Sequence, residues 1–151
     1  MKKITILALH LDYGGIEKYI SYLCKMFKND YEVEVLTTYK YNDRPAFYFS
    51  SKVKINYLTN DYPDKVSIKQ LVNNHKYFAV MKEVFRRLKL KYQVYKLNKS
   101  AIKKINSDYV ITTRIYHNEF VNKYLKNSKI IKIATEHNYH NNNQKYINKL
   151  I

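Results

Sequence analysis

The sequence predicts an α/β fold: one Rossmann-like three-layer domain with a mainly parallel sheet. Three observations favour this fold. The 151 residues are enough for one domain with a single core. Short β-branched and aliphatic runs alternate with longer segments whose apolar residues recur every three or four positions. Several of these runs are apolar at nearly every position, which is typical of parallel strands buried on both faces. This alternation predicts right-handed crossovers and helices on both faces of the sheet.

The first half of the chain is expected to contain three strands and one helix. Lys3 to Leu9 is the aliphatic run expected to form a central strand. Apolar residues at helical spacing predict a helix at 16–28 that packs one face against the sheet. Further strands are expected at 32–38 and 53–58.

The second half begins with a long, basic helical region at 67–106. Its apolar residues return every three or four positions, so we expect one face in the core and a charged face outside. These apolar residues are Met81, Val84, Phe85, Leu88, Tyr92, Tyr95, Ile102 and Ile105. A fourth strand is expected at 108–113, a short helix at 118–125, and a fifth strand at 129–135 that suits the interior of the sheet.

Composition limits the classes of function. No apolar run approaches the roughly 20 residues of a membrane-spanning helix. The single cysteine, Cys24, cannot close an intrachain disulfide, so a cytoplasmic location is expected. The formal charge of +16 indicates an anionic partner, which could be nucleic acid, an acidic membrane surface or a phosphorylated substrate.

Both glycines of the chain, Gly14 and Gly15, stand together where the first strand meets the first helix. A helix N-terminus at this edge offers unpaired N–H donors, and glycine lets a phosphate or sugar oxygen approach the backbone. The glycines could equally serve only to make a tight turn. The spacing G-x-G-x-x-G is absent, which disfavours a dinucleotide site.

Polar residues also follow the fourth and fifth strands. Glu136, His137 and Asn138 come after the fifth strand, and Arg114 follows the fourth. Carboxyl ends of parallel strands meet at one edge, so these side chains are expected to face the same crevice as the glycines. A neutral histidine could exchange a proton or bind a hydroxyl, and the arginine could bind a phosphate. His137 could instead bond a nearby carbonyl, and Arg114 could be a solvated surface residue. No histidine spacing indicates a metal site.

Taken together, these segments resemble the N-terminal, acceptor-side domain of family 4 glycosyltransferases with the GT-B fold. The opening KKITILALHLDYGGIEKYISYLCKMF is similar to that family's first strand, Gly-Gly turn, acidic-basic pair and apolar helix. SDYVITTR matches its Asp-apolar-apolar strand, and IIKIATEHN resembles its later strand with a histidine turn. Arg114 departs from the pattern, because the family often has histidine at the end of that strand. The resemblance covers essentially all of 1–151.

The resemblance implies transfer of a sugar from a nucleotide-sugar donor to a glycan or lipid-linked acceptor, with no separate cofactor and no metal. It places Gly14 and Gly15 near the donor diphosphate and His137 in the acceptor pocket as the catalytic residue. Arg114, Glu136 and Asn138 are candidate binding residues because of their places at the strand ends rather than because of the resemblance. The donor-binding acidic motif belongs to a C-terminal domain that we do not find in these residues. We therefore expect the chain alone to be inactive.

Two other functions remain open. The region 67–106 could dock on an anionic membrane surface, which would place the protein on the inner face of the plasma membrane or make it a scaffolding subunit that recruits a separate donor-binding chain. A nucleic-acid-binding module, suggested by 17 tyrosines among many lysines, is less favoured because no nucleic-acid motif is present.

Overall fold

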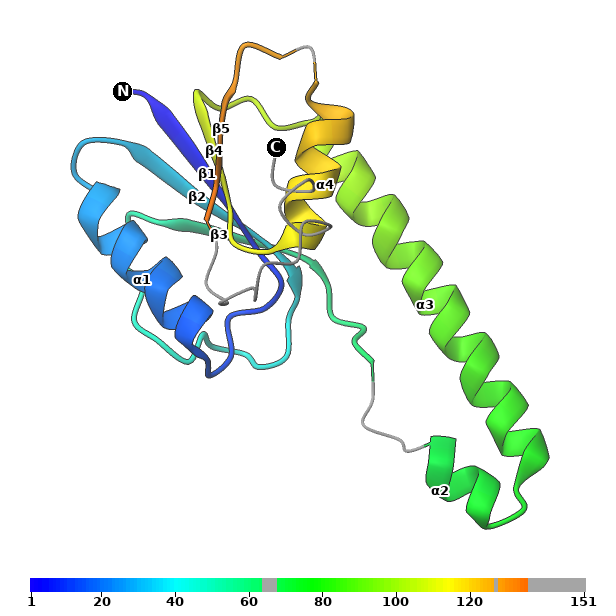
Figure 1. The fold of residues 1–151 in the computed structure, drawn as a ribbon. Coiled ribbons are helices and arrows are strands. Elements are labelled where there is room, and N and C mark those ends of the chain that lie inside the picture. Colours follow the sequence, from blue (N-terminus) through cyan, green and yellow to red (C-terminus); the bar gives the residue numbers. More distant parts are fainter. Residues whose placement is uncertain (64–67, 127, 136–151) are drawn as a thin grey trace, which may run out of the picture.

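The computed structural model describes residues 1–63, 68–126 and 128–135. They form an α/β domain with a five-stranded sheet in the order β3-β2-β1-β4-β5, in which every neighbouring pair is parallel (Figure 1). The predicted fold class is therefore confirmed. The elements are β1 (Lys3–Ala8), α1 (Gly15–Phe27), β2 (Glu32–Tyr39), β3 (Lys54–Thr59), α2 (Ile68–Asn73), α3 (Tyr77–Lys103), β4 (Tyr109–Thr112), α4 (Ile115–Tyr124) and β5 (Ile131–Ala134).

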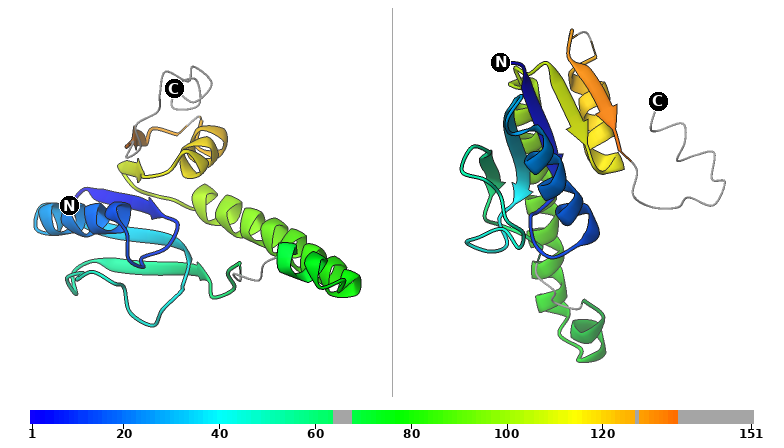
Figure 2. Two further views of the ribbon diagram at one scale, coloured as in Figure 1. Left: turned by 60° about the horizontal axis from the view of Figure 1, so that its bottom comes forward. Right: turned by 90° about the vertical axis from the view of Figure 1, so that its left-hand side faces the viewer.

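Helices cover both faces of the sheet, and the alternating side chains of β1 divide between two core clusters. Ile4 and Ile6 point to one face, where they pack with Ile20 of α1. Leu7 points to the other face and packs with Ile102 of α3 and with α4. Figure 2 shows α1 on one side of the sheet and α3 on the other. A central strand buried on both sides is what the continuous apolar run predicts.

The long basic region differs from the expectation in two ways. It is divided into α2 and α3, and the connection passes through His75, whose φ of 52° is left-handed. In addition, most of the expected core face is exposed, namely Met81, Val84, Phe85, Leu88, Tyr92 and Tyr95. Ile102 of that face is buried as expected, together with Leu90 and Val94, which were not assigned to it. The reason is geometric: only the C-terminal part of α3 lies against the sheet, and its N-terminal part extends away from the sheet with α2 (Figure 1). No helix of the described residues is both long and apolar enough to cross a membrane.

Two elements near the end of the described chain also differ. β5 is an edge strand rather than an interior one, and Ile131 and Ile133 are 55% and 40% exposed. The helix expected to start at residue 118 begins at Ile115, because Arg114 takes an extended conformation (φ −145°, ψ 145°) and starts the helix directly after β4. Arg114 is thereby placed at the edge of the sheet.

Candidate functional site

The candidate site lies beyond the carboxyl ends of β1 and β4, which are neighbours at the centre of the sheet. The chain leaves β1 towards α1 on one face, and it leaves β4 towards α4 on the other. Open α/β sheets bind ligands at such a switch point. Gly14 and Arg114 both lie against Glu17 here, and Gly15 follows Gly14 at the start of α1; their roles in binding stay predictions. Glu136, His137 and Asn138 lie outside the described residues, so their roles remain predictions.

Glu17, in the first turn of α1, lies between Gly14, His10 and Arg114. Its side chain is buried, and Arg114 Nη2 donates a hydrogen bond to Glu17 Oε1 at 2.9 Å. The carboxylate also lies so close to Gly14 that a Cβ there would overlap Glu17 Oε2. Gly14 has extended backbone angles, so glycine is needed here for space rather than for an unusual φ. A Cβ on Gly15 would meet open space.

His10 lies beside this ion pair, two residues after β1. Its Nδ1 lies 3.5 Å from Glu17 Oε1 and accepts a long hydrogen bond from the Asp12 backbone N–H at 3.4 Å. Arg114 Nε is buried and has no hydrogen-bond partner within the described part of the chain. Arg114 thus binds Glu17 through one nitrogen while another N–H is left for a ligand or water.

A cavity of about 530 Å³ opens beside Arg114. It lies between the ends of the central strands and the inner face of α3, and its wall is mostly apolar and aromatic with three cationic side chains. Its lining residues are Leu9, Tyr39, Tyr41, Pro63, Arg87, Leu90, Lys91, Val94, Arg114 and Tyr116. Such a wall fits a ligand with an apolar body and an anionic group.

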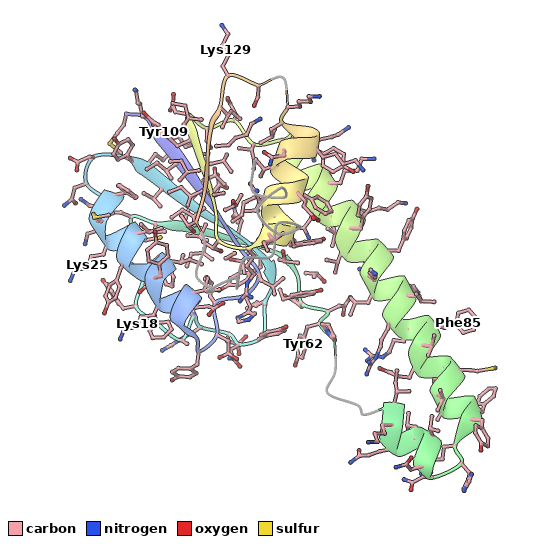
Figure 3. All side chains as sticks on the ribbon, in the orientation of Figure 1. Lys18, Lys25, Tyr62, Phe85, Tyr109 and Lys129 are labelled. Carbon is pink, nitrogen blue, oxygen red and sulfur yellow. The ribbon has the colours of Figure 1, made fainter. Side chains whose placement is uncertain are left out.

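Three of the residues that line the cavity are tyrosines, namely Tyr39, Tyr41 and Tyr116. The rings of Tyr39 and Tyr41 are stacked with centroids 5.8 Å apart, and Tyr41 meets Tyr62 edge-on at 4.8 Å. Figure 3 shows Tyr62 in the connection between β3 and the projecting helices. Burial raises the pKa of Tyr39 and Tyr41, and it raises that of Tyr116 to about 12. These phenols are therefore neutral near pH 7 and can donate hydrogen bonds to a ligand.

Behind the cavity, His117 connects three elements. Thr38 of β2 donates its hydroxyl hydrogen to Asn98 of α3, so its oxygen accepts from His117 Nε2 of α4 at 3.3 Å. This fixes the neutral Nε2–H tautomer and leaves His117 Nδ1 buried without a hydrogen-bond partner in the described chain. Burial, aided by the charge of Arg114, lowers the pKa of His117 to about 3.

No protein-family model and no curated protein matches the chain. The function must therefore be argued from the site itself. Across the described ranges, no group of three or more His, Cys, Asp and Glu side chains is arranged to hold a metal ion.

Sequence reasoning missed most partners of Arg114. Glu17, His10, Tyr116 and His117 were not assigned to the site. The sequence carried a signal for two of these residues. His10 follows the first strand by two residues, and Glu17 is the only acid in the first turn of α1. The rule that polar residues gather at strand ends applies to both once the sheet is known to be parallel.

Proposed function

We propose that this domain forms the acceptor side of a glycosyltransferase that moves a sugar from a nucleotide-sugar to a lipid-linked, anionic acceptor. The observation that carries the proposal is the cavity at the switch point, which places Arg114 with a buried N–H that has no partner in the described chain beside an apolar, tyrosine-rich wall. The resemblance of the Gly-Gly turn and of the two strand-end segments to family 4 glycosyltransferases supports sugar transfer in particular.

The chemistry asked of this domain is positioning. Glycosyl transfer needs donor and acceptor held in register and negative charge stabilised as the diphosphate departs. Arg114 is suited to hold the anionic group of an acceptor, because its charge is only partly used by Glu17. The neutral phenols of Tyr41 and Tyr116 are suited to contact sugar hydroxyls. His137 enters the proposal from the resemblance alone, as the residue that contacts the reacting sugar.

Binding tests the acceptor assignment first. In a ¹⁵N NMR titration of the chain, geranyl phosphate should shift amides around the cavity, while geraniol and inorganic phosphate should bind more weakly because each lacks one half of the ligand. The double variant Glu17→Gln/Arg114→Gln removes the cation without leaving a buried charge. It should weaken geranyl phosphate roughly tenfold or more, because a charge-assisted hydrogen bond is lost. Arg44→Gln, at an exposed loop residue, is the matched control.

Activity tests the assignment of the two substrates to two domains. The 151 residues should bind UDP-glucose weakly and form no glycosylated geranyl phosphate by mass spectrometry. Adding a GT-B donor-binding domain should restore product, and His137→Ala should then lower turnover more than stability. Efficient transfer by the chain alone would show that donor binding has been assigned wrongly. Equal affinity of the wild type and the double variant for geranyl phosphate would remove Arg114 from the acceptor site.

A further inference from the structure

Helix α3 carries a second apolar face that, apart from Tyr95 at its end, the rest of the described chain does not cover. We call it the outer stripe. Its members are 36% to 80% exposed. They are Tyr77, Phe78, Met81, Val84, Phe85, Leu88, Tyr92 and Tyr95. Isolated exposed apolar side chains are ordinary, but a continuous row of this length marks an interaction surface.

The outer stripe lies on the opposite side of α3 from the sheet, except that the ring of Tyr95 at its C-terminal end meets Phe120 of α4 edge-on at 5.3 Å. At 3.6 residues per turn its members fall within a sector of about 120°, and Leu90 and Val94 lie on the other side of the helix. Leu90 and Val94 are buried and line the cavity. In Figure 3, Phe85 points away from the sheet. The helix therefore has an inner face that serves the site and an outer face with a separate purpose.

Lysines flank the outer stripe on both sides. Helical spacing places Lys82, Lys89 and Lys96 along one border and Lys91 along the other, and all four are exposed. Residues 68–103 contain a single acid, Glu83, whose carboxylate accepts hydrogen bonds from Arg86 and Arg87 at 2.7–2.9 Å. Hydrogen bonds from these two arginines lower the pKa of Glu83 to about 2, so it is ionised and counters their charge rather than that of the bordering lysines.

We propose that the outer stripe docks α3 on an anionic lipid surface, with Phe78 and Phe85 entering the apolar boundary. Apolar and aromatic side chains bordered by lysines are the features of helices that lie in a membrane interface. Tyrosines such as Tyr77 and Tyr92 suit the headgroup level, where one end of the ring is wet.

Charge argues for lipid over a second copy of the chain. Pairing two outer stripes would bring the bordering lysines of both copies together, in a chain whose formal charge is already +16. An acidic membrane instead supplies the opposite charge along the whole helix. Docking would also bring the cavity close to the lipid, because its wall is the inner face of the same helix. The inference does not depend on sugar transfer, since vesicle binding is measured without donor or acceptor.

Insertion is tested with a single fluorophore, because the chain contains no Trp. In Phe85→Trp, emission should shift to the blue and be quenched by brominated lipid when vesicles of equal phosphatidylglycerol and phosphatidylcholine are added. Tyr48→Trp is the matched control, since Tyr48 is 83% exposed and lies outside α3. Its emission should change little.

Affinity is tested by co-sedimentation with the same vesicles. Phe78→Ser/Phe85→Ser should weaken binding roughly tenfold or more, because two apolar side chains no longer leave water. Lys82→Gln/Lys89→Gln should weaken binding roughly 25-fold at low salt, about fivefold for each charge. Lys25→Gln/Lys54→Gln removes the same charge from exposed residues of α1 and β3 and should have a smaller effect. Circular dichroism checks that each variant folds.

The proposal has clear contrary outcomes. Equal binding to acidic and to pure phosphatidylcholine vesicles would overturn it, as would wild-type affinity in the folded Phe78→Ser/Phe85→Ser variant. Sedimentation equilibrium tests whether a second copy of the chain covers the outer stripe instead. If the wild type is a dimer and Phe78→Ser/Phe85→Ser is a monomer, the outer stripe is a dimer interface and the lipid assignment is overturned. If vesicles bind but geranyl phosphate does not, docking stands and the proposed acceptor fails.

Discussion

Replacing His117 by Gln should remove an acid-sensitive part of the stability. His117 is fully buried and neutral, and its pKa is lowered to about 3 in the folded chain. In the unfolded chain a histidine has a pKa of about 6.5. Between these values the unfolded state takes up a proton that the folded state does not, so the stability due to neutral His117 is present above pH 6.5 and is lost as pH falls towards 3.

The magnitude follows from the two pKa values. Well below the unfolded value each pH unit costs about 1.4 kcal/mol, and integration from about pH 7.5 to about pH 5 gives about 2 kcal/mol. Glutamine can still offer an N–H to Thr38 but does not titrate. The variant should therefore lose about 2 kcal/mol less stability than the wild type over the same range, whatever its stability at neutral pH.

Urea unfolding followed by circular dichroism at the two pH values measures this difference. The wild type also loses stability through repulsion among its many cations, but the variant shares that loss. His75→Gln is the matched control, because it replaces an exposed histidine by the same residue. If His117→Gln loses as much stability as the wild type on acidification, the histidine is not held neutral in the folded chain and the hydrogen-bond assignment to Thr38 is wrong.

Three further predictions concern α1 and its partners. Gly14→Ala should destabilise the fold by about 1–3 kcal/mol, because the new Cβ displaces the Glu17 carboxylate. In the same urea titration, Gly15→Ala should be neutral or stabilising by up to about 1 kcal/mol, because its Cβ meets open space. Equal effects of the two variants on the free energy of unfolding would contradict the packing argument. Glu17→Gln should cost about 2 kcal/mol, less than for a fully buried pair because the Arg114 side chain is 31% exposed, and an unchanged midpoint would show the pair to be unimportant. Cys24, whose thiol pKa burial raises to about 12, should react with iodoacetamide far more slowly in the folded chain than in urea, and equal rates would show that the thiol is accessible.

Local pattern was enough to predict the strands and α1. The run from Lys3 to Ala8 and the helical spacing after Gly15 each have a single reasonable interpretation, and the structure agrees within a residue or two. The position of β5 could not be predicted in the same way. An apolar run such as 130–134 suits both an interior and an edge strand, and the order of strands is decided by contacts between distant segments.

Helix α3 shows a different limit of sequence reasoning. Its apolar residues occupy two faces, one at Leu90 and Val94 and one along the outer stripe. Periodicity indicates that a face is apolar, but it does not show which face meets the sheet. The longer row repeats every three or four residues and is therefore the one that periodicity predicts as the core. The sheet covers only the end of the helix, so the shorter row is the one that is buried.

The site was predictable at strand ends and unpredictable where it depends on long-range pairs. Gly14, Gly15 and Arg114 follow from the rule for parallel sheets, whereas the bond from Arg114 to Glu17 joins residues 97 positions apart. Under the proposed function, arginine suits this position better than lysine. A guanidinium has five N–H donors in a fixed plane, so Nη2 can bind Glu17 while other N–H groups, among them the Nε–H that has no partner in the described chain, can bind the proposed anionic acceptor. A lysine held by Glu17 would present a single compact charge, with no second directed edge for a ligand in the cavity. Arg114→Lys should therefore retain the pair with Glu17 yet bind geranyl phosphate more weakly, a result that separates ligand binding from structural support.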